Sequence, residues 1–124
     1  MKSIISIDIG EKNLGYTVAR ANEFNKETSI NDINFVSGTF DIERKKTQED
    51  VVLYRVSKIN EFLKTLINEN DFIEEVIIER QVPTNLVAMC LMYTVVSFFN
   101  NYTDRIILFD PKLKFTKINQ VYTT

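Results

Sequence analysis

The chain has 124 residues, of which 44% are hydrophobic and 26% are charged, and its formal net charge is −2. These totals fit one globular domain with a real core. They exclude a globally basic nucleic-acid-binding protein, so any binding of this kind must depend on a local patch such as the three lysines that follow Asp110. The absence of histidine excludes His-based catalytic triads and His-ligated zinc.

The single cysteine, Cys90, gives no disulfide framework and favours a reducing, intracellular compartment. The N-terminal Met1-Lys2 leads straight into a predicted strand, which leaves no room for a signal peptide. No apolar run reaches the length of a transmembrane helix, so we expect no membrane association.

Residues 3–10 (SIISIDIG) contain four isoleucines and predict a β-strand that is buried on both faces of a sheet. Asp8 lies within this run, where an ionised carboxylate is costly to bury unless a metal ion, a partner charge or several donors meet it. The chain repeats this arrangement once, in residues 76–80 (VIIER), where Glu79 ends another β-branched run. Two strands that each deliver one carboxylate predict a divalent-metal site.

Residues 13–20 and 33–42 predict a second and a third strand, which form an antiparallel meander with the first. Gly38 predicts an irregularity within the third strand. Residues 47–50 resemble a capping box at the start of a helix that runs to about Glu69. Apolar residues recur along this helix at intervals of four and three, namely Val52, Val56, Ile59, Leu63 and Leu66.

A fourth strand is predicted over residues 72–80, and a fifth over 105–110, where Pro111 stops it. Between them, residues 85–99 predict a helix, with Pro83 in its first turn and Thr84 or Gln81 near its cap. This helix is apolar nearly all round, which predicts burial on more than one side, either beneath other elements or at a subunit contact.

The resulting element order predicts an α/β fold with a mixed five-stranded sheet. A three-strand antiparallel meander is followed by α-β-α-β, and the helices pack on the sheet. This order can place the strands of Asp8 and Glu79 side by side, about 4.8 Å apart, so that both carboxylates bind one hard cation or two ions about 4 Å apart. The alternative is that Asp8 caps a turn and Glu79 pairs with Arg80 or a lysine.

Residues 7–16 (IDIGEKNLGY) and 78–81 (IERQ) together resemble the RNase H-like Holliday-junction resolvases of the RuvC-type group, and most closely their poxvirus and mitochondrial branch. The opening Asp-x-Gly-x-x-Asn motif is weak, since sugar kinases and actin-like ATPases begin similarly. The Glu-Arg-Gln triplet is more discriminating. Strand and helix order also agrees with this family over essentially the whole chain.

The resemblance implies a metal-dependent endodeoxyribonuclease in which Asp8 and Glu79 are two of four acidic metal ligands. Its cofactor would be Mg²⁺, for which Mn²⁺ can substitute, with no small-molecule cofactor. It implies two-metal hydrolysis of phosphodiester bonds in four-way DNA junctions by a homodimer, in DNA recombination or repair and in a host or virus-infected cell. Four residues are then expected to contact the DNA backbone, namely Lys12, Arg80, Gln81 and Lys112. For Lys12 and Lys112, solvated surface is an equal alternative.

One departure from the family concerns the C-terminal end. The family carries its other two acids on a helix after the fifth strand, whereas this sequence has no acid after Asp110. We therefore expect residues 1–124 to be a single, C-terminally truncated RNase H-like domain whose activity in this form is open. The alternatives are a non-catalytic nucleic-acid-binding or assembly module on the same fold, another RNase H-like nuclease that acts on RNA or flaps, and an actin-like ATPase fragment, which the glycine content disfavours.

Overall fold

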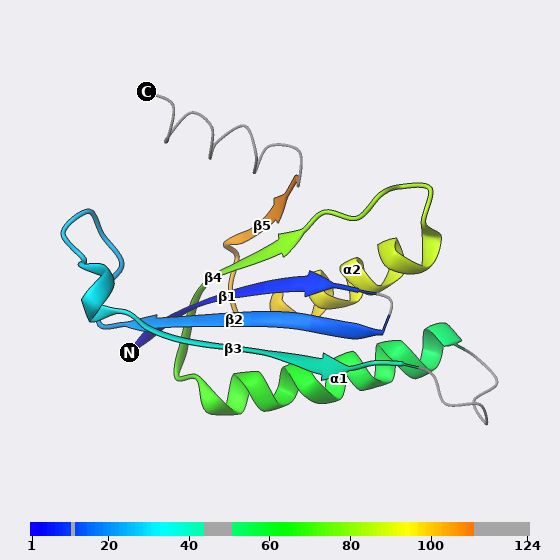
Figure 1. The fold of residues 1–124 in the computed structure, drawn as a ribbon, viewed down its shortest axis with the longest axis horizontal. Coiled ribbons are helices and arrows are strands. Elements are labelled where there is room, and N and C mark those ends of the chain that lie inside the picture. Colours follow the sequence, from blue (N-terminus) through cyan, green and yellow to red (C-terminus); the bar gives the residue numbers. More distant parts are fainter. Residues whose placement is uncertain (11, 44–50, 111–124) are drawn as a thin grey trace.

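The computed structural model describes residues 1–10, 12–43 and 51–110. Over these residues, five strands form one mixed sheet in the order β3-β2-β1-β4-β5 (Figure 1). The strands are β1 (Lys2–Ile9), β2 (Asn13–Ala21), β3 (Asn34–Asp41), β4 (Phe72–Glu79) and β5 (Ile106–Phe109). The first three pair antiparallel, whereas β4 pairs parallel with β1 and β5 parallel with β4. The predicted element order is confirmed.

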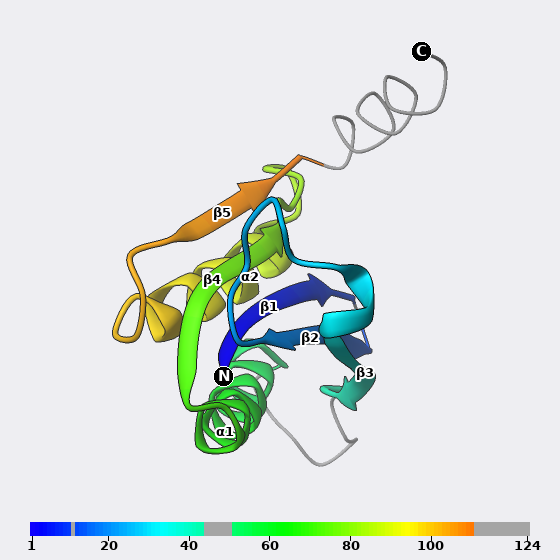
Figure 2. The ribbon, with the colours of Figure 1, turned by 90° about the vertical axis from the view of Figure 1, so that its left-hand side faces the viewer.

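Two helices connect these strands and pack against each other. Helix α1 (Val51–Glu69) connects β3 to β4, and α2 (Leu86–Phe99) connects β4 to β5, while a short 3₁₀ turn, η1 (Ile30–Asp32), precedes β3. Figure 2 shows the sheet with its helices in a view turned by 90°. Neither helix is long and apolar enough to cross a lipid bilayer, and this holds for every helix in the described ranges.

The burial of β1 corrects the prediction that this strand is covered on both faces. Ile5, Ile7 and Ile9 are buried, whereas Ser6 and Asp8, which alternate with them, are exposed. Successive side chains of a strand point to opposite faces, and the core that includes α1 and α2 lies on the isoleucine side. The other face, which we call the open face, therefore presents Asp8 to solvent.

The two helices bury their apolar residues differently. In α1, Ile59, Leu63 and Leu66 are buried, as the predicted stripe requires. In α2, burial is confined to one side, formed by Leu91, Met92, Val95 and Phe99. The opposite side is solvent-exposed in the single chain, with Leu86 77% exposed and Tyr93 51% exposed. Burial of α2 by other elements on more than one side is therefore not found, and a subunit contact stays a prediction.

Local signals near Gly38 and at the start of α2 differ from expectation. Gly38 continues the regular register opposite Tyr16. A Cβ at Gly38 would lie 2.7 Å from the Tyr16 hydroxyl oxygen, so the glycine makes room for a ring rather than breaking the strand. The N-cap of α2 is Asn85, whose Oδ1 accepts a hydrogen bond from the backbone N–H of Ala88 at 3.1 Å. Pro83 precedes the helix, and the proposed capping box at 47–50 lies outside the described residues.

A buried polar contact fixes the end of α1 against the sheet. Asn70, which is 6% exposed, accepts hydrogen bonds at Oδ1 from Ser3 Oγ at 3.2 Å and from Arg20 Nε at 2.7 Å. Its Nδ2 donates to the carbonyl oxygen of Leu66 at 2.7 Å. Helix α1 thus ends at Glu69, as the sequence predicts, and Asn70 directly after it joins α1 to β1 and β2 at the end of the sheet opposite Asp8.

Candidate metal and nucleic-acid site

Asp8 and Glu79 lie at the carboxyl ends of two neighbouring strands. The parallel register pairs Ile7 of β1 with Ile78 of β4, so the next residues along each strand stand beside each other on the open face. Both side chains line one small pocket of about 100 Å³, together with Ser6, Ile77 and Phe109. The structure therefore brings together two carboxylates that are 71 positions apart in the sequence.

The surroundings of these carboxylates differ from those predicted. Asp8 is exposed and Glu79 is half-buried, so the cost of burying a charge does not by itself demand a cation at Asp8. What favours a cation is the convergence of the two groups on one pocket. Two carboxylates fit Mg²⁺, because this ion is commonly held by one or two of them and keeps waters or substrate phosphate oxygens as its other ligands.

The described residues contain no group of three or more His, Cys, Asp or Glu side chains arranged to hold a metal. Two protein carboxylates leave most of an octahedral coordination shell to water and to other oxygen atoms. The pair at β1 and β4 is therefore at most part of a metal site within the ranges that the structure describes.

The predicted DNA-contacting residues cluster at the same edge of the sheet. Lys12, in the β1–β2 turn, and Arg80, directly after β4, are both exposed. Gln81 is half-buried, and its Nε2 donates to the carbonyl oxygen of Glu79 at 3.0 Å. Lys112 lies outside the described residues. Three of the four therefore follow the carboxyl ends of the strands that carry Asp8 and Glu79, where α/β sheets commonly bind their ligands.

Sequence reasoning missed a further basic residue at this edge, Arg55 of α1. Arg55 lines a cavity of about 520 Å³ with residues from the ends of β1 and β4 and from the start of α2. Its position offers a signal in retrospect: Arg55 lies three residues after Val52 and four before Ile59, and is thus on the apolar side of the helix. A charged residue on that side has to be placed at the rim of the core or beside a ligand.

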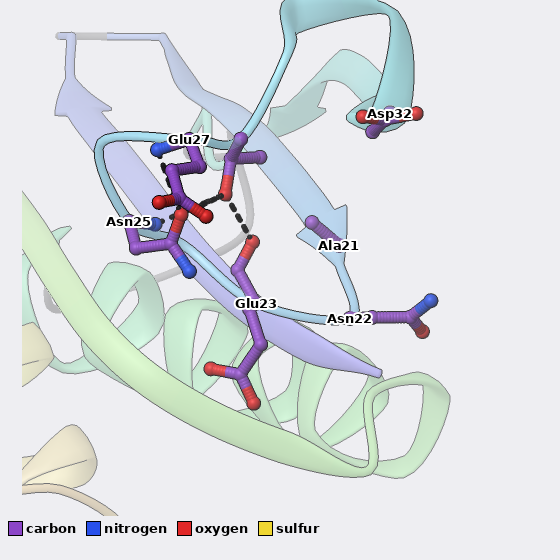
Figure 3. Close-up of a pocket in the computed structure, with 7 residues that line it drawn as sticks. Ala21, Asn22, Glu23, Asn25, Glu27 and Asp32 are labelled. Atoms are coloured by element: carbon purple, nitrogen blue, oxygen red, sulfur yellow. Dashed lines mark hydrogen bonds between the residues drawn. The ribbon is translucent and has the colours of Figure 1, made fainter.

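A separate cavity of about 360 Å³ lies at the far end of the sheet, in the β2–β3 connection. Its lining includes the carboxylates of Glu23, Glu27 and Asp32, but Figure 3 shows these three side chains pointing to different places. The hydrogen bonds of this loop are internal, such as that from Thr28 Oγ1 to the carbonyl oxygen of Glu23 at 2.9 Å. We therefore interpret this cavity as a consequence of the loop's own turn structure. Because its lining includes three carboxylates, it does not attract an anion.

Comparison with known proteins places the fold. No protein-family model matches the chain, and no curated protein sequence matches it either. Among solved structures, the fowlpox virus resolvase in complex with Holliday junction DNA is similar, with a TM-score of 0.55 and 22% identity over 88% of this chain and 60% of that chain. RuvC from Thermus thermophilus has a TM-score of 0.57 and 14% identity, over 88% and 64% of the two chains.

The same Thermus protein in complex with a Holliday junction substrate gives a TM-score of 0.56 and 13% identity over 98% of this chain and 71% of that chain. The chain thus spans less than two thirds of the fowlpox resolvase and of the first RuvC structure. At these identities the similarity establishes the fold, which is RNase H-like, and the predicted fold class is confirmed. Two of these three structures, the fowlpox virus resolvase and the Thermus RuvC complex, were solved with Holliday junction DNA.

Proposed function

We propose that this chain is the RNase H-like domain of a metal-dependent endonuclease that cuts phosphodiester bonds in four-way DNA junctions. The observation that carries the proposal is the convergence of Asp8 and Glu79 on one pocket at the carboxyl ends of β1 and β4. Support comes from the fold, which the chain shares with resolvases solved on Holliday junctions. The exposure of Asp8 also leaves room for a substrate phosphate on the open face.

In this proposal each residue has a distinct role. Asp8 and Glu79 supply the carboxylate oxygens that hold Mg²⁺ or Mn²⁺. The bound ion would orient a water molecule and stabilise the charge that develops on the phosphate oxygens. The exposed charges of Lys12 and Arg80 bind neighbouring phosphates and fix the position of the DNA strand without reading its sequence.

We also propose that the domain acts as a homodimer through the outer side of α2. No charged residue occurs in this helix, whose sequence is LVAMCLMYTVVSFF. Its outer side exposes Leu86, Cys90 and Tyr93. A two-fold contact brings the same surface of two copies together, and an uncharged apolar surface does so without repulsion between like charges. Light scattering should give the mass of a dimer for the wild type and that of a monomer for Tyr93→Glu; a monomeric wild type would refute this surface.

The test of the nuclease proposal compares three variants of the chain on a labelled four-way junction. Asp8→Asn and Glu79→Gln should abolish cleavage in Mg²⁺ or Mn²⁺ and leave junction binding in EDTA largely intact. Glu75→Gln is the matched control, because Glu75 lies on the same face of β4 as Glu79 and its carboxylate lies 3.8 Å from the exposed guanidinium of Arg105. Cleavage by Asp8→Asn at the wild-type rate would refute the metal assignment.

A second candidate function is a non-catalytic module that binds branched nucleic acid. The observation that favours it is the absence of a third metal-ligating side chain beside Asp8 and Glu79 in the described part of the chain. It predicts that the wild type binds the junction and does not cut it at any concentration of Mg²⁺ or Mn²⁺. A nicked duplex and an RNA–DNA hybrid, run in parallel, separate a junction-selective enzyme from another nuclease of this fold.

A further inference from the structure

The cavity beside Arg55 lies on the helix-covered side of the same sheet edge. It is formed where β1 ends at Ile9 and Gly10, where Gln81 follows β4, and where α2 begins at Asn85. Alternation along β1 sends Asp8 to the open face and Ile9 toward the helices, so the cavity and the carboxylate pair lie on opposite faces of the sheet. Its volume of about 520 Å³ is large enough for a group bigger than a single water molecule.

Within the part of the chain that the structure describes, Arg55 is the only charged residue that lines this cavity. Its Nε atom is buried and, among the described residues, has no hydrogen-bond partner. A buried donor of a charged group that lacks a partner destabilises the fold, and native structures nearly always satisfy such groups by protein, water or ligand. The cavity is therefore lined by a cationic side chain whose Nε donor has no acceptor among the described residues.

The first turn of α2 supplies further donors to the same place. Among the backbone N–H groups at this helix start, those of Asn85, Ala88 and Met89 have acceptors: the carbonyl oxygen of Val82, the side chain of Asn85 and the carbonyl oxygen of Asn85. The N–H groups of the two residues between them, Leu86 and Val87, have no acceptor within the described ranges, and Val87 lines the cavity. A helix N-terminus with free N–H groups attracts anions.

A guanidinium and the free N–H groups of a helix start match a phosphate group in both charge and number of oxygen acceptors. Among the described residues, no carboxylate lines the cavity to oppose such an anion. The neighbouring edge is the one at which Asp8 and Glu79 converge, so a nucleic-acid strand that crosses the ends of β1 and β4 can meet both places. The identity of the phosphate rests on the proposed function, whereas the anion site rests on the cavity itself.

We propose that Arg55 and the first turn of α2 bind one phosphodiester of a nucleic-acid strand that places another of its phosphodiesters at Asp8 and Glu79. The site holds the strand on the helix-covered side of the sheet edge and thereby fixes its direction across the carboxylate pair. Arg55 is then a binding residue that does not touch the reacting phosphate.

The first arm of the test asks for the anion site alone. The full chain, labelled with ¹⁵N, is titrated with inorganic phosphate and followed by NMR. The amide signals of Leu86 and Val87 should shift in the wild type, shift less in Arg55→Lys and stay in place in Arg55→Gln. Lys64→Gln is the control, because Lys64 is an exposed cation on the same helix. The spectra also report whether each variant is folded. The proposal is refuted if the amide signals of Leu86 and Val87 do not shift with phosphate in the wild type, or if they shift equally in Arg55→Gln.

The second arm identifies the source of the phosphate. Binding of a four-way junction in EDTA is measured by fluorescence anisotropy at several salt concentrations. Arg55→Gln should weaken binding about tenfold at low salt. It should also reduce the slope of log K against log[salt] by about 0.9, the value for one lost phosphate contact, and Lys64→Gln should change neither quantity.

The outcomes separate this inference from the proposed function. Junction binding with an unchanged slope in Arg55→Gln overturns the inference and leaves the proposed function standing. In a second outcome, the amide signals shift with phosphate in an Arg55-dependent way, but the chain binds no junction. The anion site then stands, whereas a nucleic-acid strand as its occupant and the proposed function are both refuted. Arg55-dependent changes in both arms support the inference.

Discussion

Replacement of Asn70 by alanine should destabilise the whole fold while leaving the chemistry of the Asp8 edge intact. The side chain of Asn70 makes three hydrogen bonds, to Ser3, to Arg20 and to the carbonyl oxygen of Leu66. Alanine removes all three and leaves the Ser3 hydroxyl, in a residue that is 1% exposed, without its partner. The contact also holds the end of α1 on β1 and β2, at the end of the sheet that is remote from Asp8.

The expected loss in the free energy of unfolding follows from the environment of each hydrogen bond. The bond from Arg20 involves a charged donor and contributes about 1.5 to 3 kcal/mol, but Arg20 is only half-buried and can bind water instead, so its lower limit applies. The two remaining bonds join neutral groups and contribute about 1 kcal/mol each. The sum is a loss of about 3.5 kcal/mol from a total that is about 5 to 15 kcal/mol for a domain of this kind.

Urea denaturation at equilibrium measures this loss. For an m-value of about 2 kcal/mol/M, the unfolding midpoint should fall by about 1.8 M, with m unchanged. Asn68→Ala is the control, because Asn68 is an exposed asparagine two residues earlier in the same helix, and its effect should stay within about 0.5 kcal/mol. A loss below about 1 kcal/mol for Asn70→Ala, or equal losses for the two variants, would refute the role of Asn70. Junction binding by Asn70→Ala should match the wild type in buffer without urea.

Three further outcomes are expected. Gly38→Ala should destabilise the fold by about 1 to 2 kcal/mol, because its Cβ would meet the Tyr16 ring, and Tyr16→Phe should recover part of this loss in a double-mutant cycle by urea denaturation. The hydrogen bond to Glu23 raises the pKa of the Lys2 ammonium above its ordinary value of 10.5. The pair therefore stabilises the fold below that value and the effect is lost as the pH rises through the raised pKa, a loss that thermal melts of Glu23→Gln should not show. Mg²⁺ at ten times its Kd should stabilise the wild type by about 1.4 kcal/mol in thermal melts, and Asp8→Asn should abolish this gain.

The order of the elements was predictable because it depends on local periodicity. The four-three spacing of apolar residues along α1 and the β-branched runs of β1 and β4 are set by neighbouring residues alone. The meander followed by α-β-α-β then leaves few ways to pair the strands, and one of them places Asp8 beside Glu79. The pairing of these two carboxylates was therefore within reach of the sequence, although their role as metal ligands stays a prediction.

The sequence could not determine which faces and groups are covered, because coverage depends on residues that are distant in the chain. The same isoleucine-rich strand suits a sheet covered on one face or on both, and only the position of α1 and α2 on the same side leaves Asp8 exposed. The polar contact of Asn70 with Ser3 and Arg20 joins residues that are 67 and 50 positions apart.

The place of Arg55 was likewise decided by tertiary structure. Its position on α1 is visible in the sequence, but its cavity forms only where α1, α2 and the ends of β1 and β4 meet. Burial of its Nε atom results from packing between these elements, which no local pattern encodes. The free amides of Leu86 and Val87 belong to the helix start itself, and only packing brings them to this cavity. The sequence by itself determined the strands, the helices and the carboxylate pair. The tertiary structure decided which charged groups face solvent and which are buried without a hydrogen-bond partner, because burial depends on how the sheet and helices pack together.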